Sequence, residues 1–93
     1  MDGNTRYESE ITAGPGGVMT DEVGVVTGDL TVATTVTGEQ AETRVQYTGA
    51  EEWYILIGSP IPLAGRSGRQ VHEAILRAAE QGLPEGLTAD HLS

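Results

Sequence analysis

Threonine is unevenly distributed along this chain, and its distribution separates a strand-rich first half from a helical second half. Ten of the eleven threonines precede Gly49, in segments where apolar and polar residues alternate. Residues 68–81 instead space their apolar side chains three and four positions apart, as a helix requires. Because β-branched residues favour strands, we predict an α+β fold. The expected architecture is an antiparallel β-meander of three to five strands, followed by one C-terminal helix packed on the sheet.

The segment Thr5–Thr12 alternates charged residues with Tyr7, Ser9 and Ile11. A period of two with charges on one face is typical of an edge strand. We therefore expect a strand here, with a charged outer face.

Val23–Thr37 is interpreted as a hairpin that turns at Gly28 and Asp29. Its second arm alternates apolar residues with a small, polar set that we expect to be solvated (Thr31, Ala33, Thr35 and Thr37). The next strand, Glu42–Thr48, is expected to direct Thr43, Val45 and Tyr47 inward.

Glu52–Ile57 is apolar on both faces of a strand, which is typical of a strand covered on both sides. Trp53, Ile55 and Ile57 share one face and are expected in the core, whereas Tyr54 and Leu56 share the other. We predict that this is the central strand, covered by a second layer or by a dimer contact. The candidate interface residues are Tyr54, Leu56 and Trp53.

The helix predicted over Gly68–Gln81 has a clear start and a clear end. Ser67 stands at the N-cap with Gln70 three residues later, the pattern of a capping box. Gly82 follows the last apolar position, where a glycine commonly ends a helix. His72, near the helix start, is interpreted as a surface histidine.

We divide the chain into an N-terminal strand or flexible segment (1–22), a β-meander and helix domain (23–82) and a C-terminal tail (83–93). No motif links the sequence to a known family. The beginning of the sequence lacks an apolar leader, so we expect a cytoplasmic protein.

Charge and composition restrict the chemistry. The chain has no cysteine and no lysine, which excludes thiol, disulfide and Schiff-base chemistry. Residues 1–52 carry ten acids and two arginines, a net charge of −8, whereas residues 53–93 carry −1. An acidic first half repels nucleic acid and anionic membranes and attracts a basic protein. The expected partners are therefore another protein or a second copy of the chain in a homodimer, with no nucleic acid and no membrane.

Catalytic and metal-binding patterns are weak. Gly65–Arg69 approaches the nucleophile elbow G-x-S-x-G but ends in arginine, so Ser67 is better explained as a helix cap. His72 and His91 lie far apart in the sequence, and their spacing matches no metal motif. We therefore expect no catalytic residues, no metal, no cofactor and no enzymatic activity.

Two functional hypotheses follow. The first is a small acidic, non-enzymatic interaction module that acts as a regulator, an inhibitor or an assembly partner. The alternative is a small-molecule or anion-binding domain that uses Trp53 and Tyr54 with Arg66, Ser67 and Arg69 at the helix N-terminus, where free backbone N–H groups favour anions.

Overall fold

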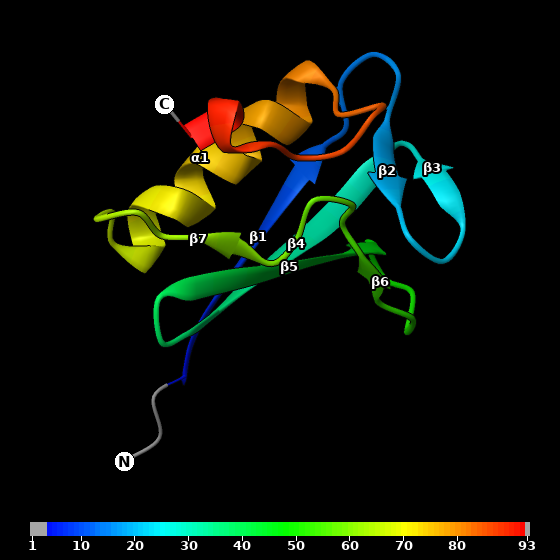
Figure 1. Ribbon diagram of the computed structural model, residues 1–93. Helices are drawn as coiled ribbons and strands as arrows, with labels where there is room; N and C mark the ends of the chain where they lie inside the picture. The colour runs from blue at the N-terminus through cyan, green and yellow to red at the C-terminus, as the bar shows by residue number, and fades with distance from the viewer. Residues whose placement is uncertain (1–3, 93) are drawn as a thin grey trace.

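The larger of two antiparallel sheets forms the frame of the molecule. The computed structural model describes residues 4–92, and in it β1 (Asn4–Thr12), β4 (Asp29–Thr37) and β5 (Gln40–Tyr47) lie side by side. The short strands β6 (Tyr54–Ile55) and β7 (Ile61–Pro62) both pair with β5, while β2 (Val18–Thr20) and β3 (Gly24–Val26) form a second sheet. Helix α1 (Gly68–Gln81) packs on one face of the larger sheet, and the 3-10 helix η1 (Ala89–Leu92) follows it (Figure 1). The α+β prediction is confirmed.

One hydrophobic core lies between α1 and the larger sheet and continues under the smaller sheet. Its most deeply buried apolar side chains come from strands, helix and C-terminal loop alike (Val18, Leu30, Val32, Val45, Leu56, Val71, Ile75 and Leu83). Burying these side chains is the main favourable term in the fold, at roughly 1.5–3 kcal/mol for each large one. Residues from all three predicted segments, 1–22, 23–82 and 83–93, therefore share this core.

Helix α1 begins and ends where the sequence predicts. The Ser67 hydroxyl accepts a hydrogen bond from the Gln70 N–H, and the Gln70 side chain accepts one from the Ser67 N–H at 2.9 Å. Gly82 ends the helix with a φ of 104°, a conformation that L side chains rarely adopt. Within residues 4–92, no helix has both the length and the apolar character needed to cross a bilayer.

The predicted hairpin over Val23–Thr37 is wrong, because β3 and β4 belong to different sheets. β3 pairs with β2, and the turn between them is closed by the Thr20 hydroxyl, which donates to the Gly24 carbonyl at 2.7 Å. β4 instead pairs along its full nine residues with β1. If the three-residue β3 paired with β4, most of the edge of β4 would lack hydrogen bonds. The nine-residue β1 therefore lies beside β4 in its place.

The prediction of a central strand over Glu52–Ile57 is also wrong. β6 has two residues and lies at one end of the sheet, whereas β4 lies between β1 and β5. The register places Tyr54 opposite buried Val45, so Tyr54 and Leu56 face the core, and Leu56 is 1% exposed. Trp53 consequently lies on the opposite face, away from α1.

Three other predicted core positions are also less buried than expected. Ile55 and Ile57 are only half-buried, and Tyr47 is 42% exposed at the end of β5. Alternation along a strand predicts which face a side chain takes, but not whether another element covers that part of the face.

Candidate functional site

Three polar side chains from three elements meet beneath the first half of α1. His72 Nδ1 lies 2.8 Å from the Thr34 hydroxyl oxygen on β4, and His72 Nε2 lies 3.0 Å from the Ser9 hydroxyl oxygen on β1. The Tyr7 ring stacks on the imidazole, with ring centroids 5.7 Å apart. Both nitrogens of a buried imidazole are thus satisfied, as burial of a polar group requires.

The pleat of β1 and the register of the sheet bring these groups together. Tyr7 and Ser9 point to the same face because they are two residues apart, and Thr34 on β4 lies opposite Tyr7. His72 is 4% exposed, so its interpretation as a surface histidine is wrong. The signal for its burial was in the sequence, because His72 precedes Ile75 by three positions and Ala79 by seven, on the apolar stripe.

Burial lowers the pKa of His72, and the nearby Glu73 carboxylate opposes this effect only in part. The neutral imidazole donates through one nitrogen and accepts through the other. In serine–histidine catalysis, a carboxylate stabilises the imidazolium that forms. Within residues 4–92 no carboxylate hydrogen-bonds to this ring, and Thr34 offers only a neutral hydroxyl. The arrangement fits a structural hydrogen-bond chain better than an activated nucleophile.

A hollow of about 440 Å³ lies beside this cluster, between β1 and α1. Two exposed ion pairs stand in its walls: Arg6 with Glu8 at 2.9 Å, and Arg69 with Glu73 at 3.5 Å. Each cation in the hollow therefore already has a carboxylate beside it, and such exposed pairs contribute at most about 1 kcal/mol each.

The predicted anion-binding residues do not converge. Arg66 lines a different hollow from Arg69, one that it shares with Arg77, and its guanidinium reaches the Leu63 carbonyl at 3.4 Å. The Ser67 hydroxyl is occupied by the helix cap.

The predicted interface residues are divided between two faces of the sheet. Leu56 is part of the core, and Tyr54 packs partly against it. The Tyr54 hydroxyl donates to Glu52 at 3.0 Å, and this carboxylate raises the pKa of Tyr54. Only Trp53 lies on the face that α1 leaves uncovered.

Trp53 and Arg6 meet above the uncovered face of the sheet. The Arg6 guanidinium carbon lies 5.1 Å from the centre of the Trp53 ring, within range of a cation–π contact. Arg6 belongs to β1 and Trp53 directly precedes β6, so their side chains reach toward each other over β4 and β5. Ala33 and Thr31 of β4 are only 2% and 8% exposed, which corrects the prediction that their face is solvated. Sequence reasoning missed this pair because no local pattern connects the two residues.

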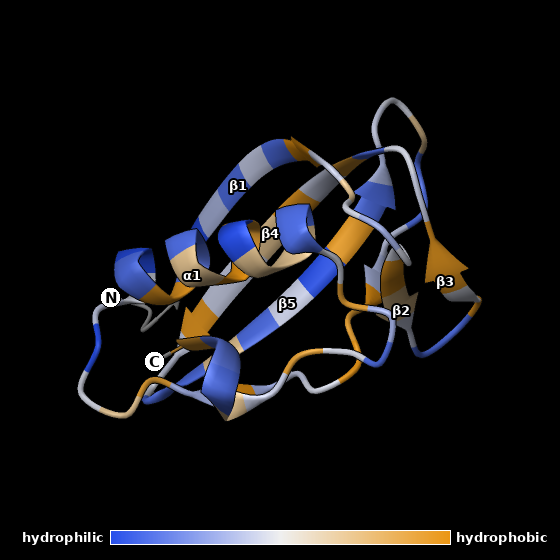
Figure 2. Ribbon diagram, turned by 90° about the horizontal axis from the view of Figure 1, so that it is seen from above, coloured by the Kyte–Doolittle hydropathy of each residue, from blue (hydrophilic) through white to orange (hydrophobic). Residues whose placement is uncertain are grey.

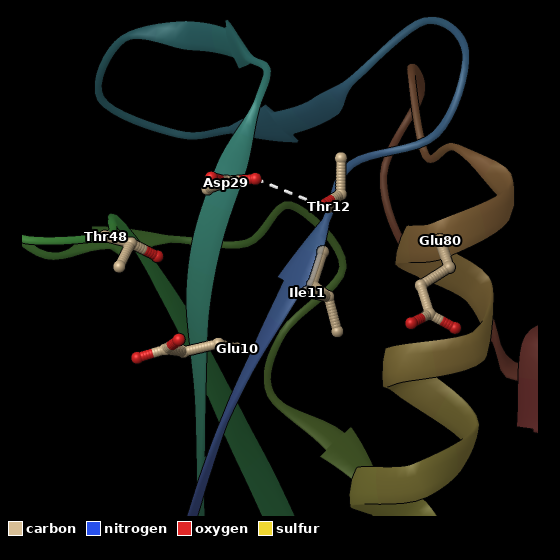
Figure 3. Close-up of a pocket in the computed structure, with 6 residues that line it drawn as sticks. All are labelled: Glu10, Ile11, Thr12, Asp29, Thr48 and Glu80. Carbon is tan, nitrogen blue, oxygen red and sulfur yellow. Dashed lines mark hydrogen bonds between the residues drawn. The ribbon is translucent and has the colours of Figure 1, made fainter.

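A second hollow, of about 410 Å³, lies at the C-terminal end of β1 (Figure 3). Figure 3 shows Glu10 directed away from α1, whereas Ile11 and Glu80 lie on the α1 side of the strand. Thr12 donates to Asp29 at 3.0 Å. Within residues 4–92, no three histidine, cysteine or acidic side chains come close enough together to hold a metal ion.

No family model, no curated protein and no solved structure matches this chain.

Proposed function

We propose that this protein is a small acidic interaction module, without catalytic activity of its own, that binds another protein as a regulator, an inhibitor or an assembly partner. The observation that carries the proposal is the contact between Arg6 and Trp53 on the face opposite α1. Arginine and tryptophan are enriched among the residues that contribute most binding energy at protein interfaces. The expected cytoplasmic setting belongs to the same proposal.

The charge of this face supports a basic partner. Arg6 and Arg44, the arginines of β1 and β5, each have a carboxylate nearby, Glu8 at 2.9 Å and Glu42 at 3.5 Å. On this face of the three long strands, Glu8, Glu10 and Glu42 outnumber Arg6 and Arg44, and residues 1–52 together carry a net charge of −8. Such a field accelerates encounter with a positively charged protein and discriminates against acidic ones.

Affinity capture with matched variants tests the proposal. Trp53→Ala and Arg6→Ala should each lose a protein that the wild type retains from lysate of the source cells. Tyr47→Ala removes an exposed aromatic residue and Arg77→Ala an exposed arginine, neither of which belongs to the Arg6–Trp53 contact, and both variants should retain the protein. Binding should also weaken as salt is added, because exposed charges are screened. If all four variants capture the same proteins as the wild type, Trp53 is not a contact and the proposal fails.

A second copy of the chain is the competing occupant of this face. The net charge of −9 on each copy opposes a homodimer, whereas a basic partner relieves that repulsion. Light scattering coupled to gel filtration distinguishes the two. A monomer near 9.8 kDa supports a separate partner, and a dimer that Trp53→Ala converts to monomer supports self-association.

Anion binding is the second candidate function, because Arg6 and Arg69 line one hollow with Ser9 and His72. An anion there would have to displace Glu8 or Glu73 from its arginine. Trp53 is the only tryptophan and contacts Arg6, so its fluorescence should respond to phosphate. Arg69→Ala should abolish the response and Arg66→Ala, in a different hollow, should keep it. No response in millimolar phosphate ends this alternative.

A further inference from the structure

We propose that the edge of β1 that faces away from β4, here called the free edge, binds an extended basic segment of another protein by strand addition. The inference rests on the proposed role as an interaction module and uses a surface that includes Arg6 but not Trp53. It specifies the conformation of the bound segment and the side chains that the segment carries.

β1 is a long strand with a partner on one side only. It pairs with β4 over nine residues and ends the order β1-β4-β5-β6, and Figure 2 shows no described element beyond it. In the part of the chain that the structure describes, no backbone hydrogen bond links residues 5–12 to any segment other than β4. Alternate residues of an edge strand present unpaired N–H and C=O groups, and these are a template for an added strand.

The free edge is accessible because the molecule is hollowed beside it. The 440 Å³ hollow adjoins Arg6–Ser9, and the 410 Å³ hollow adjoins Glu10–Thr12. Together the two hollows adjoin the strand from Arg6 to Thr12, and residues of α1 form part of the wall of each. An added strand needs such space for the side chains on its two faces.

Carboxylates stand on both sides of the free edge near its C-terminal end. Glu10 projects on the uncovered side of the sheet and Glu80 on the α1 side, and Asp29 lines the same hollow (Figure 3). No basic residue lines that hollow, and no salt bridge within residues 4–92 includes Glu10 or Glu80. Because neighbouring residues of an added strand point to opposite faces, two adjacent lysines or arginines would meet Glu10 and Glu80 respectively.

The net charge of the chain disfavours a second copy at this edge, because each copy carries −9. An antiparallel pairing of β1 with β1 that is centred on Ser9 would also place Glu8 of each copy opposite Glu10 of the other, whereas a pairing centred on Glu8 would place Arg6 opposite Glu10. A basic segment relieves the net charge in every register and is therefore the occupant that we propose.

NMR titration with synthetic peptides tests the inference. The probe is a blocked nine-residue peptide of alternating valine and threonine with two adjacent lysines at its centre, and its comparison carries two glutamates instead. The lysine peptide should shift the amide resonances of residues 5–12 and slow the hydrogen exchange of their unpaired amides, whereas the glutamate peptide should not. Two further versions of the lysine peptide carry a methyl group on every second backbone nitrogen, one on the odd and one on the even positions. One version should lose binding and the other should keep it, because only alternate N–H groups of the added strand face β1.

Matched charge variants complete the experiment. The double variant Glu10→Gln with Glu80→Gln should weaken peptide binding about threefold to tenfold, as expected for two partly exposed ion pairs. Glu39→Gln with Glu85→Gln removes the same charge from exposed positions that line neither hollow and should leave binding unchanged.

Three results would overturn the inference: no binding of the lysine peptide, equal tolerance of both methylation patterns, or a concentration-dependent dimer that protects residues 5–12 without peptide. Trp53→Ala should leave peptide binding intact. If the lysine peptide does not bind, only the strand-addition inference fails, because the role of Trp53 is tested separately by affinity capture.

Discussion

Thr34 and Thr43 lie opposite each other on β4 and β5, both fully buried, yet their hydroxyls differ in what they bind. The Thr34 hydroxyl is 2.8 Å from His72 Nδ1. The Thr43 hydroxyl has no hydrogen-bond partner within residues 4–92. One buried hydroxyl is thus part of a polar chain, whereas its neighbour bears the cost of burial without a bond.

Replacing each threonine by valine should therefore change stability in opposite directions. Thr43→Val removes an unsatisfied hydroxyl at constant shape and should raise the free energy of unfolding by roughly 1 kcal/mol. Thr34→Val leaves His72 Nδ1 buried without its partner and should lower that free energy by about 1–3 kcal/mol. Urea denaturation of the two variants measures both effects, and a loss of stability in Thr43→Val would show that its hydroxyl is satisfied after all.

Stability should depend on pH through His72. Its pKa is lower in the folded state than the ordinary value near 6.5, because burial disfavours the imidazolium. The unfolded chain therefore binds the proton more tightly. The free energy of unfolding should be fully retained above about pH 6.5 and should fall as the pH drops from there through the folded pKa.

His72→Gln isolates this contribution, because its amide can still donate and accept but does not titrate. Thermal unfolding between pH 5 and 7, a range chosen around the ordinary histidine pKa, should show a smaller pH dependence in this variant. His91→Gln, at an exposed position, serves as the matched control. If the unfolding temperature of His72→Gln depends on pH as strongly as that of the wild type, His72 is not the source of the pH dependence.

Two glycines with similar backbone conformations should tolerate alanine very differently. Gly49 and Gly58 have φ values of +92° and +99°, so a side chain at either position would introduce a similar backbone strain. A Cβ at Gly49 meets open space, whereas one at Gly58 collides with the Leu87 carbonyl. Gly49→Ala should lose roughly 1 kcal/mol of stability, and Gly58→Ala should lose several, enough to threaten a domain of this size. Equal losses on denaturation would indicate that the loop at Leu87 moves aside.

Removing the guanidinium above Trp53 should expose the indole. Arg6→Ala should increase quenching of tryptophan fluorescence by acrylamide and cost about 0.5–1 kcal/mol of stability, the range for a cation–π contact near the surface. Arg77→Ala, which removes an exposed arginine of α1, should leave the quenching unchanged. If acrylamide quenches the tryptophan fluorescence of both variants to the same extent, Arg6 does not shield the Trp53 ring in solution.

Local patterns predicted the parts of the fold that depend on neighbouring residues. The capping box at Ser67, the helix end at Gly82 and the alternation of β1 each involve residues a few positions apart. The pairing of β1 with β4 and of β2 with β3 was not predictable in this way. Which strands pair depends on all the strand edges that the folded chain makes available. The nine-residue β1 therefore pairs with β4, and the three-residue β3 pairs with β2 instead.

The sequence by itself determined the α+β class, the helix bounds, the acidic first half and the lack of thiol and lysine chemistry, because these follow from composition and short-range spacing. Only the tertiary structure decided that His72 is buried between Ser9 and Thr34, that Leu56 lies in the core and that Arg6 reaches Trp53. Each of these contacts joins segments distant in the chain. Sheet register and helix packing fix them together, and no single segment encodes them.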